Sequence, residues 1–307
     1  MKKIYDYELN QAQSQYDKDE KKSPFAIYED EYATRKVVDR PTGIITNELH
    51  KHICTALSKY LVLTSNLLMR LFNNNGLLYD KEQIQKSLRQ LKQSAFIQAI
   101  KFENSSGGCS SHNAYVLGFR GTGYVNALGI HLRMGNYIAA CDAAQLKKIL
   151  ACNQLVINGN FEKIQISQIV LREPKNPQEK ACHIFRPTGT ILNAEGEICQ
   201  FIESVRRTPT AQEDMINKIE RMLKVFKEKE YANVQITNNP RLIVIGEDYR
   251  HICELIRTCE PFRKKLDIVY SYDLAIYSSQ NSEDFLYEYI AADNRWNFFR
   301  KTLAACF

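Results

Sequence analysis

The chain has no long hydrophobic run. None of the apolar stretches in its 307 residues approaches the ~20 residues that a membrane-spanning helix needs. The N-terminal sequence MKKIYDYELNQ also lacks the apolar segment of a signal peptide. The sequence therefore predicts a cytoplasmic protein that makes no membrane contact.

Cysteine motifs are also absent. The nine cysteines are odd in number and form no CxxC pair, so we expect reduced thiols rather than disulfides. Cys109 and His112 have a metal-like spacing, but no second ligand pair accompanies them, and zinc is not expected. The composition of the whole chain, 44% hydrophobic and 25% charged, excludes a collagen-like or mainly disordered protein. The length predicts two globular units and a tail.

Positive charge is concentrated in one part of the chain. The net charge is +6, yet residues 41–150 hold 12 basic and 5 acidic residues, whereas residues 151–307 hold 21 of each. A concentrated basic field favours a polyanion partner, because each neutralised phosphate releases condensed counterions. An ordinary solvated surface is the alternative.

Residues 1–45 are polar, have mixed charge and end near the breaker Arg40-Pro41-Thr42-Gly43, which predicts a flexible arm. Residues 46–119 then predict three helices, over 46–61, 65–73 and 81–95, and a hairpin with strands 96–102 and 114–119. Thr64 and Asp80 are suitable N-caps. This order predicts a winged helix-turn-helix domain over residues 46–153, with helices 123–131 and 141–152 as an extension.

The second helix of a helix-turn-helix enters the major groove of DNA, where Arg and Gln side chains reach base edges. We therefore expect double-stranded DNA as the partner. Helix 81–95 supplies the base-reading candidates, and two basic residues near the wing could hold phosphates. The predicted DNA-binding residues are Gln83, Lys86, Arg89, Gln90, Gln93, Lys101 and Arg120. The alternative is a winged helix that binds another protein.

From residue 154 onward, strands and helices alternate. An all-apolar run over 241–246 is typical of a strand covered on both faces, and Thr210 and Asp248 are candidate caps of two helices. A last β region is expected over 266–277, and the aromatic-rich segment 282–307 is expected to pack into its own domain. The whole chain is thus predicted to combine α+β and α/β parts.

The winged helix is followed by the block RPTGTILNAEGEICQFIESVRRTPTAQEDMINKIERMLKVFKE. With this block, residues 46–277 resemble the replication-relaxation family of plasmids and other mobile elements, which includes MobC-type relaxases. The resemblance implies that residues 154–307 form a domain similar to PD-(D/E)xK nucleases, the restriction-endonuclease-like fold. It also implies a role in replication, in mobilisation as part of a relaxosome, or in their regulation, alongside other replication or relaxosome proteins.

Nucleases of this kind hold Mg²⁺ with two acidic residues and usually position water with a lysine. By the resemblance, the first acidic residue is replaced by Thr188 in Pro187-Thr188-Gly189, Glu203 matches the second, and Val205 stands where the lysine would be. Lys218 matches a basic position on the following helix. Glu203 and Lys218 are therefore the candidate catalytic residues of a degenerate site, and we expect a non-enzymatic protein without a cofactor.

Two alternatives remain open for this site. Glu203 could pair with Arg206 or Lys218 as an ordinary strand residue. Alternatively, Glu195 or Glu197 supplies a displaced ligand and Lys218 replaces the lost lysine, which would give a Mg²⁺-dependent DNA-nicking endonuclease or relaxase. Elsewhere, His50-Lys51-His52 is interpreted as a pair of charged surface histidines. The glycines of Gly118-Phe-Arg-Gly121-Thr-Gly123 are interpreted as the turn after the wing.

Overall fold

The computed structural model describes residues 25, 32–36, 47–103, 109–130, 141–160, 164–165, 169–171, 183–229, 232–278, 286–292 and 295–300. Contacts divide the chain into two compact units. Unit 2 comprises residues 27–157, and unit 1 comprises residues 1–26 together with 158–307. The boundary at 157 lies four residues beyond the one that the sequence suggested.

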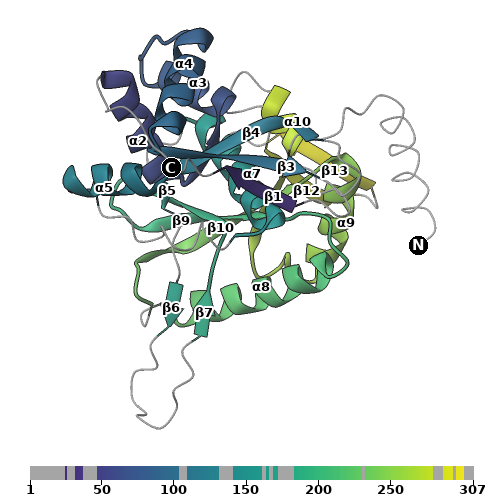
Figure 1. The fold of residues 1–307 in the computed structure, drawn as a ribbon. Helices are drawn as coiled ribbons and strands as arrows, with labels where there is room; N and C mark the ends of the chain where they lie inside the picture. The colour runs from purple at the N-terminus through teal and green to yellow at the C-terminus, as the bar shows by residue number, and fades with distance from the viewer. Residues whose placement is uncertain are drawn as a thin grey trace. The chain divides into compact units, whose positions relative to one another are not determined.

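Unit 2 contains the three helices and the hairpin that the sequence predicted (Figure 1). Their order is α2 (Glu48–Tyr60), β2 (Val62–Thr64), α3 (Ser65–Asn74), α4 (Lys81–Gln93), β3 (Ile97–Glu103) and β4 (Cys109–Leu117). The short strand β2, which the sequence analysis did not anticipate, pairs antiparallel with β4. A helix, a strand, two helices and a hairpin therefore follow one another along the chain.

Side chains at the helix starts explain where α3 and α4 begin. The Thr64 hydroxyl oxygen accepts a hydrogen bond from the backbone N–H of Leu67 at 3.2 Å. The Asp80 carboxylate accepts one from the N–H of Gln83 at 2.7 Å, and the Gln83 side chain accepts one from the N–H of Asp80 at 3.1 Å. These bonds satisfy N–H groups that a helix leaves unpaired. Both predicted caps are thus confirmed.

Strand β1 (Tyr32–Lys36) corrects the expectation of a flexible arm over residues 1–45. It pairs antiparallel with β3, so the sheet of unit 2 has the order β1-β3-β4-β2. The segment YATRK shows no strong alternation of apolar and polar residues. Its strand conformation is therefore set by pairing with β3, a contact between distant parts of the sequence.

Two further helices complete unit 2, namely α5 (Phe119–Ala127) and α7 (Ala143–Asn158). Helix α7 is buried on nearly all sides, and its buried residues include the polar Lys147, Asn153 and Gln154. Its Asn153 amide donates to the carbonyl oxygens of Tyr60 and Val62, both at 2.8 Å. This amide holds the junction of α2 and β2, where Leu61 has a positive φ of 68°.

Unit 1 contains a seven-stranded mixed sheet with the order β13-β12-β11-β10-β9-β8-β5. At its centre, β9 (Ile198–Ser204), β10 (Ile236–Gly246) and β11 (Asp267–Tyr272) are parallel. The outer strands β5 (Ile164–Gln165), β8 (Gly189–Leu192), β12 (Tyr287–Ala292) and β13 (Arg295–Arg300) pair antiparallel. A separate small pair joins β6 (Ile169–Leu171) to β7 (His183–Phe185).

Helices α8 (Ala211–Lys227) and α9 (Tyr249–Cys259) connect the parallel strands and pack against the sheet (Figure 1). A cluster of buried apolar residues lies between these two helices and the sheet. It includes Phe201 and Val244 from the strands, Met215 from α8 and Ile252 from α9. The β region expected up to residue 277 ends earlier, because α10 (Asp273–Ser278) follows β11.

The described residues thus form a mixed α/β protein with two principal sheets. Within these residues, no helix combines the length and the apolar character that crossing a bilayer requires. In the aromatic-rich C-terminal segment, Leu286 is buried. The other side chains of that segment on which the packing prediction rested lie outside the described residues.

Candidate functional site

Helix α4 exposes one polar face. Its apolar residues Ile84, Leu88 and Leu91 are buried, as the helical period requires. The predicted DNA-reading residues all lie on the remaining surface. Gln83, Lys86, Arg89, Gln90 and Gln93 are exposed.

Two of these glutamines already make contacts within the protein. The Gln83 side chain belongs to the capping box described above, and the Gln90 Oε1 atom lies 3.1 Å from Nε2 of His50. Arg89 makes one long bond from its Nε to the Gln85 carbonyl oxygen at 3.4 Å. Lys86, Arg89 and Gln93 therefore remain the side chains best placed to reach a partner.

The two predicted phosphate-binding residues differ in their surroundings. Lys101 lies on β3 and is half-buried. Arg120 lies on α5, donates from Nη1 to the Ser94 carbonyl oxygen at 3.1 Å, and places its guanidinium over the ring of Phe96 at 4.8 Å. Because these contacts hold the Arg120 side chain against its own unit, it is less available than Lys101.

The interpretation of His50 as a charged surface residue is wrong. His50 is buried, and its burial lowers the pKa of the imidazole, although the contact with Gln90 acts in the opposite direction. His52 is half-buried, and its Nδ1 atom lies 3.0 Å from the hydroxyl of Tyr79. Both histidines stabilise the packing of α2 against its neighbours.

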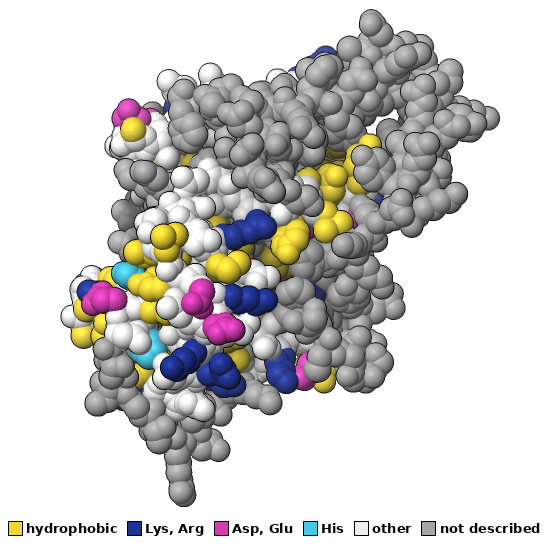
Figure 2. Space-filling view, turned by 90° about the horizontal axis from the view of Figure 1, so that it is seen from above, with side chains coloured by type: hydrophobic (Ala, Val, Ile, Leu, Met, Phe, Trp, Pro, Cys, Tyr) yellow, Lys and Arg dark blue, Asp and Glu magenta, His cyan; other side chains and the backbone are white. Residues whose placement is uncertain are grey.

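Figure 2 shows one face of the protein, on which Lys and Arg side chains lie among hydrophobic and uncharged ones, with acidic side chains beside them. On α4 itself, Lys81, Lys86 and Arg89 share the exposed surface with Glu82. This surface can offer both hydrogen-bond donors and acceptors to a partner.

In unit 1, the three residues Thr188, Glu203 and Lys218, which the sequence analysis singled out, come together. Thr188 precedes β8, Glu203 lies near the end of β9, and Lys218 lies on α8. Strands β8 and β9 pair antiparallel with Gly189 opposite Ile202, which places Thr188 beside Glu203. The following helix α8 packs on this face of the sheet and presents Lys218 to the same carboxylate.

One oxygen of Glu203 receives both contacts. Its Oε2 atom accepts from Lys218 Nζ at 2.6 Å and from Thr188 Oγ1 at 3.2 Å. The Thr188 hydroxyl also accepts from the backbone N–H of Ser204 at 3.2 Å. Glu203 is 1% exposed, and its Oε1 atom has no hydrogen-bond partner among the described residues. Lys218, and not Arg206, is therefore the ion-pair partner of Glu203.

The donor set fits a tightly bound divalent cation poorly. It offers one carboxylate and a neutral hydroxyl, and the Lys218 ammonium group already occupies the same carboxylate oxygen. Mg²⁺ prefers near-octahedral oxygen ligands with compensating negative charge. Val205 has no donor atom in its side chain, and it is buried in the apolar cluster with residues of α8 and α9, so it adds no ligand.

Glu195 and Glu197 cannot replace the missing carboxylate. Glu197 immediately precedes β9, six positions before Glu203, and a strand advances about 3.3 Å per residue, which separates the two by roughly 20 Å. Glu197 instead accepts a hydrogen bond from the Asn193 amide at 3.1 Å. Glu195 is exposed in the turn before it. The displaced-ligand alternative therefore loses its two named candidates.

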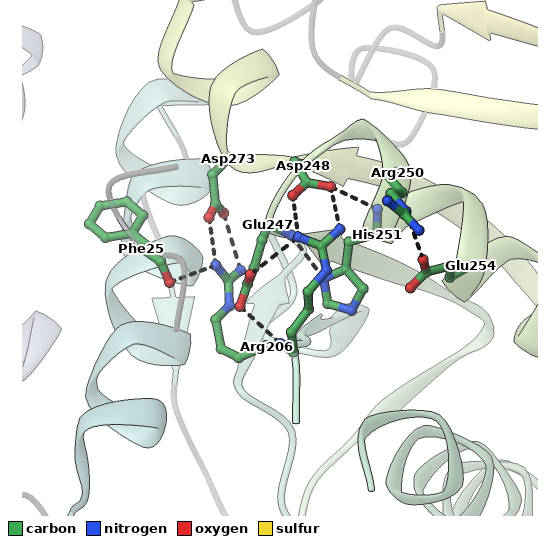
Figure 3. Close-up of polar contacts among 9 residues, drawn as sticks. Phe25, Arg206, Glu247, Asp248, Arg250, His251, Glu254 and Asp273 are labelled. Carbon is green, nitrogen blue, oxygen red and sulfur yellow. Dashed lines mark hydrogen bonds and ion pairs between the residues drawn. The ribbon is translucent and has the colours of Figure 1, made fainter. Parts of the chain in front are cut away.

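Charged residues also gather where the parallel strands end. Arg206 donates to both carboxylate oxygens of Asp273, to the Ser204 hydroxyl at 2.8 Å and to the Phe25 carbonyl oxygen at 3.2 Å. Figure 3 shows Asp273 and the Phe25 carbonyl pointing toward this guanidinium. The sequence suggested a different partner for Arg206. No signal in the sequence points to this pair, because Asp273 falls inside the β region expected over 266–277.

Beside this pair, Arg207 forms an ion pair with Asp248, at 2.7 Å between Nη2 and Oδ1. Burial alone would raise the pKa of the Asp248 carboxyl, but the bonds from Arg207 and from the His251 N–H hold it below its usual value. Burial, together with the nearby charges of Arg207 and Arg206, lowers the pKa of His251 to about 3. His251 is therefore neutral, and its Nδ1 accepts a bond from the Glu247 N–H at 3.2 Å.

Within the part of the chain that the structure describes, no group of three or more His, Cys, Asp or Glu residues could hold a metal ion. The side chains of Cys109 and His112 lie outside the described residues. No protein-family model, no curated protein and no solved structure matches this chain.

Proposed function

We propose that this chain is a DNA-binding protein of a plasmid or other mobile element, with a role in replication, mobilisation or their regulation. The observation that carries the proposal is the exposed face of α4, where Lys86, Arg89 and Gln93 project from the second of two consecutive helices. Such a helix reads base edges in the major groove.

Unit 2 is proposed to be a winged helix-turn-helix domain. Its element order, in which α2, β2, α3 and α4 precede the β3–β4 hairpin, supports this interpretation. The short strand β2 pairs with the returning strand β4, as a wing sheet requires. Strand β1 adds a further strand on the other side of β3. The surplus of basic residues over 41–150 is consistent with a phosphate backbone as partner.

Unit 1 is proposed to be a nuclease-like domain that has lost catalysis. An antiparallel β8–β9 pair followed by α8 and the parallel strand β10 supports the resemblance to the restriction-endonuclease-like fold. The meeting of Thr188, Glu203 and Lys218 supports the same motif positions. Because one carboxylate holds Mg²⁺ weakly without other ligands, this domain would serve DNA or the other replication and relaxosome proteins by contact rather than by cleavage.

The proposal is tested by measuring DNA binding of the full chain. Affinity for a duplex selected from a randomised pool should fall steeply between low and moderate salt, because bound lysines and arginines release counterions. Arg89→Ala should weaken the selected site by about 1–3 kcal/mol while leaving random DNA less affected. Arg221→Ala, which removes an exposed arginine from α8 in unit 1, is the control for the loss of one positive charge, and it should not change the preference for the selected site over random DNA.

Two results would contradict the proposal. Affinity that does not depend on salt would exclude a phosphate-bound complex. A wild-type protein that binds no duplex would favour a unit 2 that contacts another protein, the alternative that the same helical surface allows.

A second function, Mg²⁺-dependent DNA nicking, has one observation in its favour. The Oε1 atom of the buried Glu203 has no partner among the described residues, so it could meet a cation that a bound phosphate brings with it. Incubation with supercoiled plasmid that carries the element's transfer origin, with Mg²⁺ or Mn²⁺, separates the two functions. Nicking by the wild type that disappears in Glu203→Gln would establish the nuclease, and no nicking by either favours binding without catalysis.

A further inference from the structure

The segment between α3 and α4 carries an apolar side chain in solvent. Leu78 is 88% exposed, although single exposed hydrophobic residues are common on protein surfaces. Its position distinguishes it, because it lies two residues before Asp80, the N-cap of the helix proposed to read DNA. The inference below rests on that proposed function.

The backbone around Leu78 is fixed. Gly76, with a φ of 72°, ends α3, and the N–H of Leu77 then donates to the Phe72 carbonyl oxygen at 2.9 Å. The N–H of Tyr79 donates to the Leu77 carbonyl oxygen at 3.0 Å. This bond between residues i and i+2 closes a γ-turn with Leu78 at its centre.

The next residue, Tyr79, is anchored to the protein body. Its ring packs edge-on against Phe72 with centroids 5.6 Å apart, and its hydroxyl lies 3.0 Å from Nδ1 of His52. Leu77, on the other side, is half-buried. The Leu78 side chain therefore projects into solvent from an ordered turn. Because the turn is already ordered, a partner that contacts Leu78 causes little further loss of chain entropy.

The chemistry around Leu78 is mixed. Along the first turns of α4 stand the cations Lys81 and Lys86 and the carboxylate of Glu82, while the carboxylate of Asp80 is already used by the cap. In the major groove, hydrogen-bonding base edges lie beside one apolar group, the C5-methyl of thymine. An apolar side chain just before the reading helix, next to the polar side chains of its first turns, matches that pattern.

We propose that Leu78 contacts the C5-methyl group of a thymine at the edge of the site read by α4, and so contributes sequence preference. The partner of this exposed side chain is thus duplex DNA. It adds a specificity-determining residue to the helix candidates Lys86, Arg89 and Gln93.

Deoxyuridine tests this contact, because it lacks only the C5-methyl group of thymidine. In a duplex that the full-length wild type selects from a randomised pool, each thymine in turn is replaced by deoxyuridine. At one position the wild type should lose about fourfold in affinity, the value of one buried methyl-sized group. Leu78→Ala should bind the thymine duplex about fourfold more weakly than the wild type does. Its affinity should not fall further when the thymine is replaced by deoxyuridine.

Phe119→Ala is the matched control. Phe119 is 89% exposed, but it begins α5 next to Gly118, which packs against Ala95 beyond the C-terminal end of α4. The 13 residues of α4 span about 20 Å between the two positions. Phe119→Ala should keep the full sensitivity of the wild type to deoxyuridine.

Several results would overturn the inference while leaving DNA binding intact. The first is a selected site that contains no thymine. The second is a wild-type affinity that no deoxyuridine replacement changes. The third is a Leu78→Ala protein whose affinity falls with deoxyuridine as much as that of the wild type. A loss of folding is not expected at so exposed a position, and circular dichroism of the variant checks it. A wild type that binds no DNA would instead remove the proposed function and this inference with it.

Discussion

Arg206 and Asp273 form an ion pair in which neither side chain is exposed to solvent, with 2.5 Å between Nη1 and Oδ2. Arg206 stands just after β9 and Asp273 just after β11, and these two strands flank the central strand β10. The same guanidinium also holds the Ser204 hydroxyl and the carbonyl oxygen of Phe25. One buried cation therefore links the sheet of unit 1 to a residue of the N-terminal segment.

Arg206→Met should destabilise the protein strongly. It leaves the Asp273 carboxylate buried without its counter-charge, and breaking a buried pair in this way costs about 3–5 kcal/mol. The double variant Arg206→Met with Asp273→Leu should lose less than the single variant, because it removes both charges. Urea denaturation gives the free energy of unfolding of each.

Arg263→Ala is the control, since it removes a half-exposed arginine from a pair with Glu260. It should cost less than about 1 kcal/mol. Equal losses for the Arg206 and Arg263 variants would mean that the buried pair contributes no more than a surface one.

His251 should make the protein less stable as the pH falls below neutrality. Its pKa in the folded protein is about 3, whereas in the unfolded chain it is about 6.5. The unfolded state therefore binds a proton first, and the free energy of unfolding falls with decreasing pH between these two values. From pH 7 to pH 5 the loss should be about 2 kcal/mol.

Denaturation of the wild type and of His251→Gln at both pH values checks this prediction. Gln can still accept the Glu247 N–H but takes up no proton, so the variant should lose about 2 kcal/mol less over the same interval. The low pKa of Asp248 acts at more acidic pH and does not interfere. Parallel pH profiles would show that the pKa of His251 is the same in the folded and the unfolded protein.

Two glycines two residues apart on α5 should respond in opposite ways to alanine. A Cβ on Gly121 would lie 2.0 Å from the Phe96 carbonyl oxygen, whereas one on Gly123 would meet nothing within 4 Å. Gly121→Ala should therefore destabilise by about 1–3 kcal/mol, and Gly123→Ala should stabilise by about 0.5–1 kcal/mol. Thermal unfolding of the two variants measures both effects, and a change of the same sign would contradict the close packing of α5.

These glycines illustrate what the sequence could and could not predict. The caps Thr64 and Asp80 and the buried stripe of α4 depend on residues within one turn of each other, so local chemistry was sufficient. Gly121 was interpreted as a turn residue, because the Phe96 carbonyl that requires it lies 25 positions away. Strand β1 was missed for the same reason, since its partner is β3.

The candidate site was predicted in part. The motif resemblance singled out Glu203 and Lys218, and the structure brings them together through β9 and α8. On α4, the helical period identified the exposed face, but it could not indicate that Gln90 already contacts the distant His50. The pairing of Arg206 with Asp273 joins two strands that are not adjacent in the sheet, and spacing along the chain carries no signal for it.

Replacing Thr188 by aspartate should create a weak metal site. The Thr188 hydroxyl lies 3.2 Å from Oε2 of Glu203, so Thr188→Asp would bring a second carboxylate to the same place. Without metal, the two like charges should lower the melting temperature. With 10 mM Mg²⁺ and a dissociation constant of about 1 mM, binding to the folded state should restore about 1.4 kcal/mol. Replacing Val205 by lysine would instead bury an ammonium group in the apolar cluster.

Thr188→Asn is the matched control, because it has nearly the same shape as aspartate but carries no charge. Melting temperatures are compared with EDTA and with Mg²⁺ or Mn²⁺ for the wild type and both variants. Only Thr188→Asp should gain stability from the metal, since Mg²⁺ prefers charged oxygen ligands and only this variant adds a second carboxylate beside Glu203. An equal gain in the wild type would mean that Glu203 already binds the cation, and this would favour the nuclease over the degenerate site.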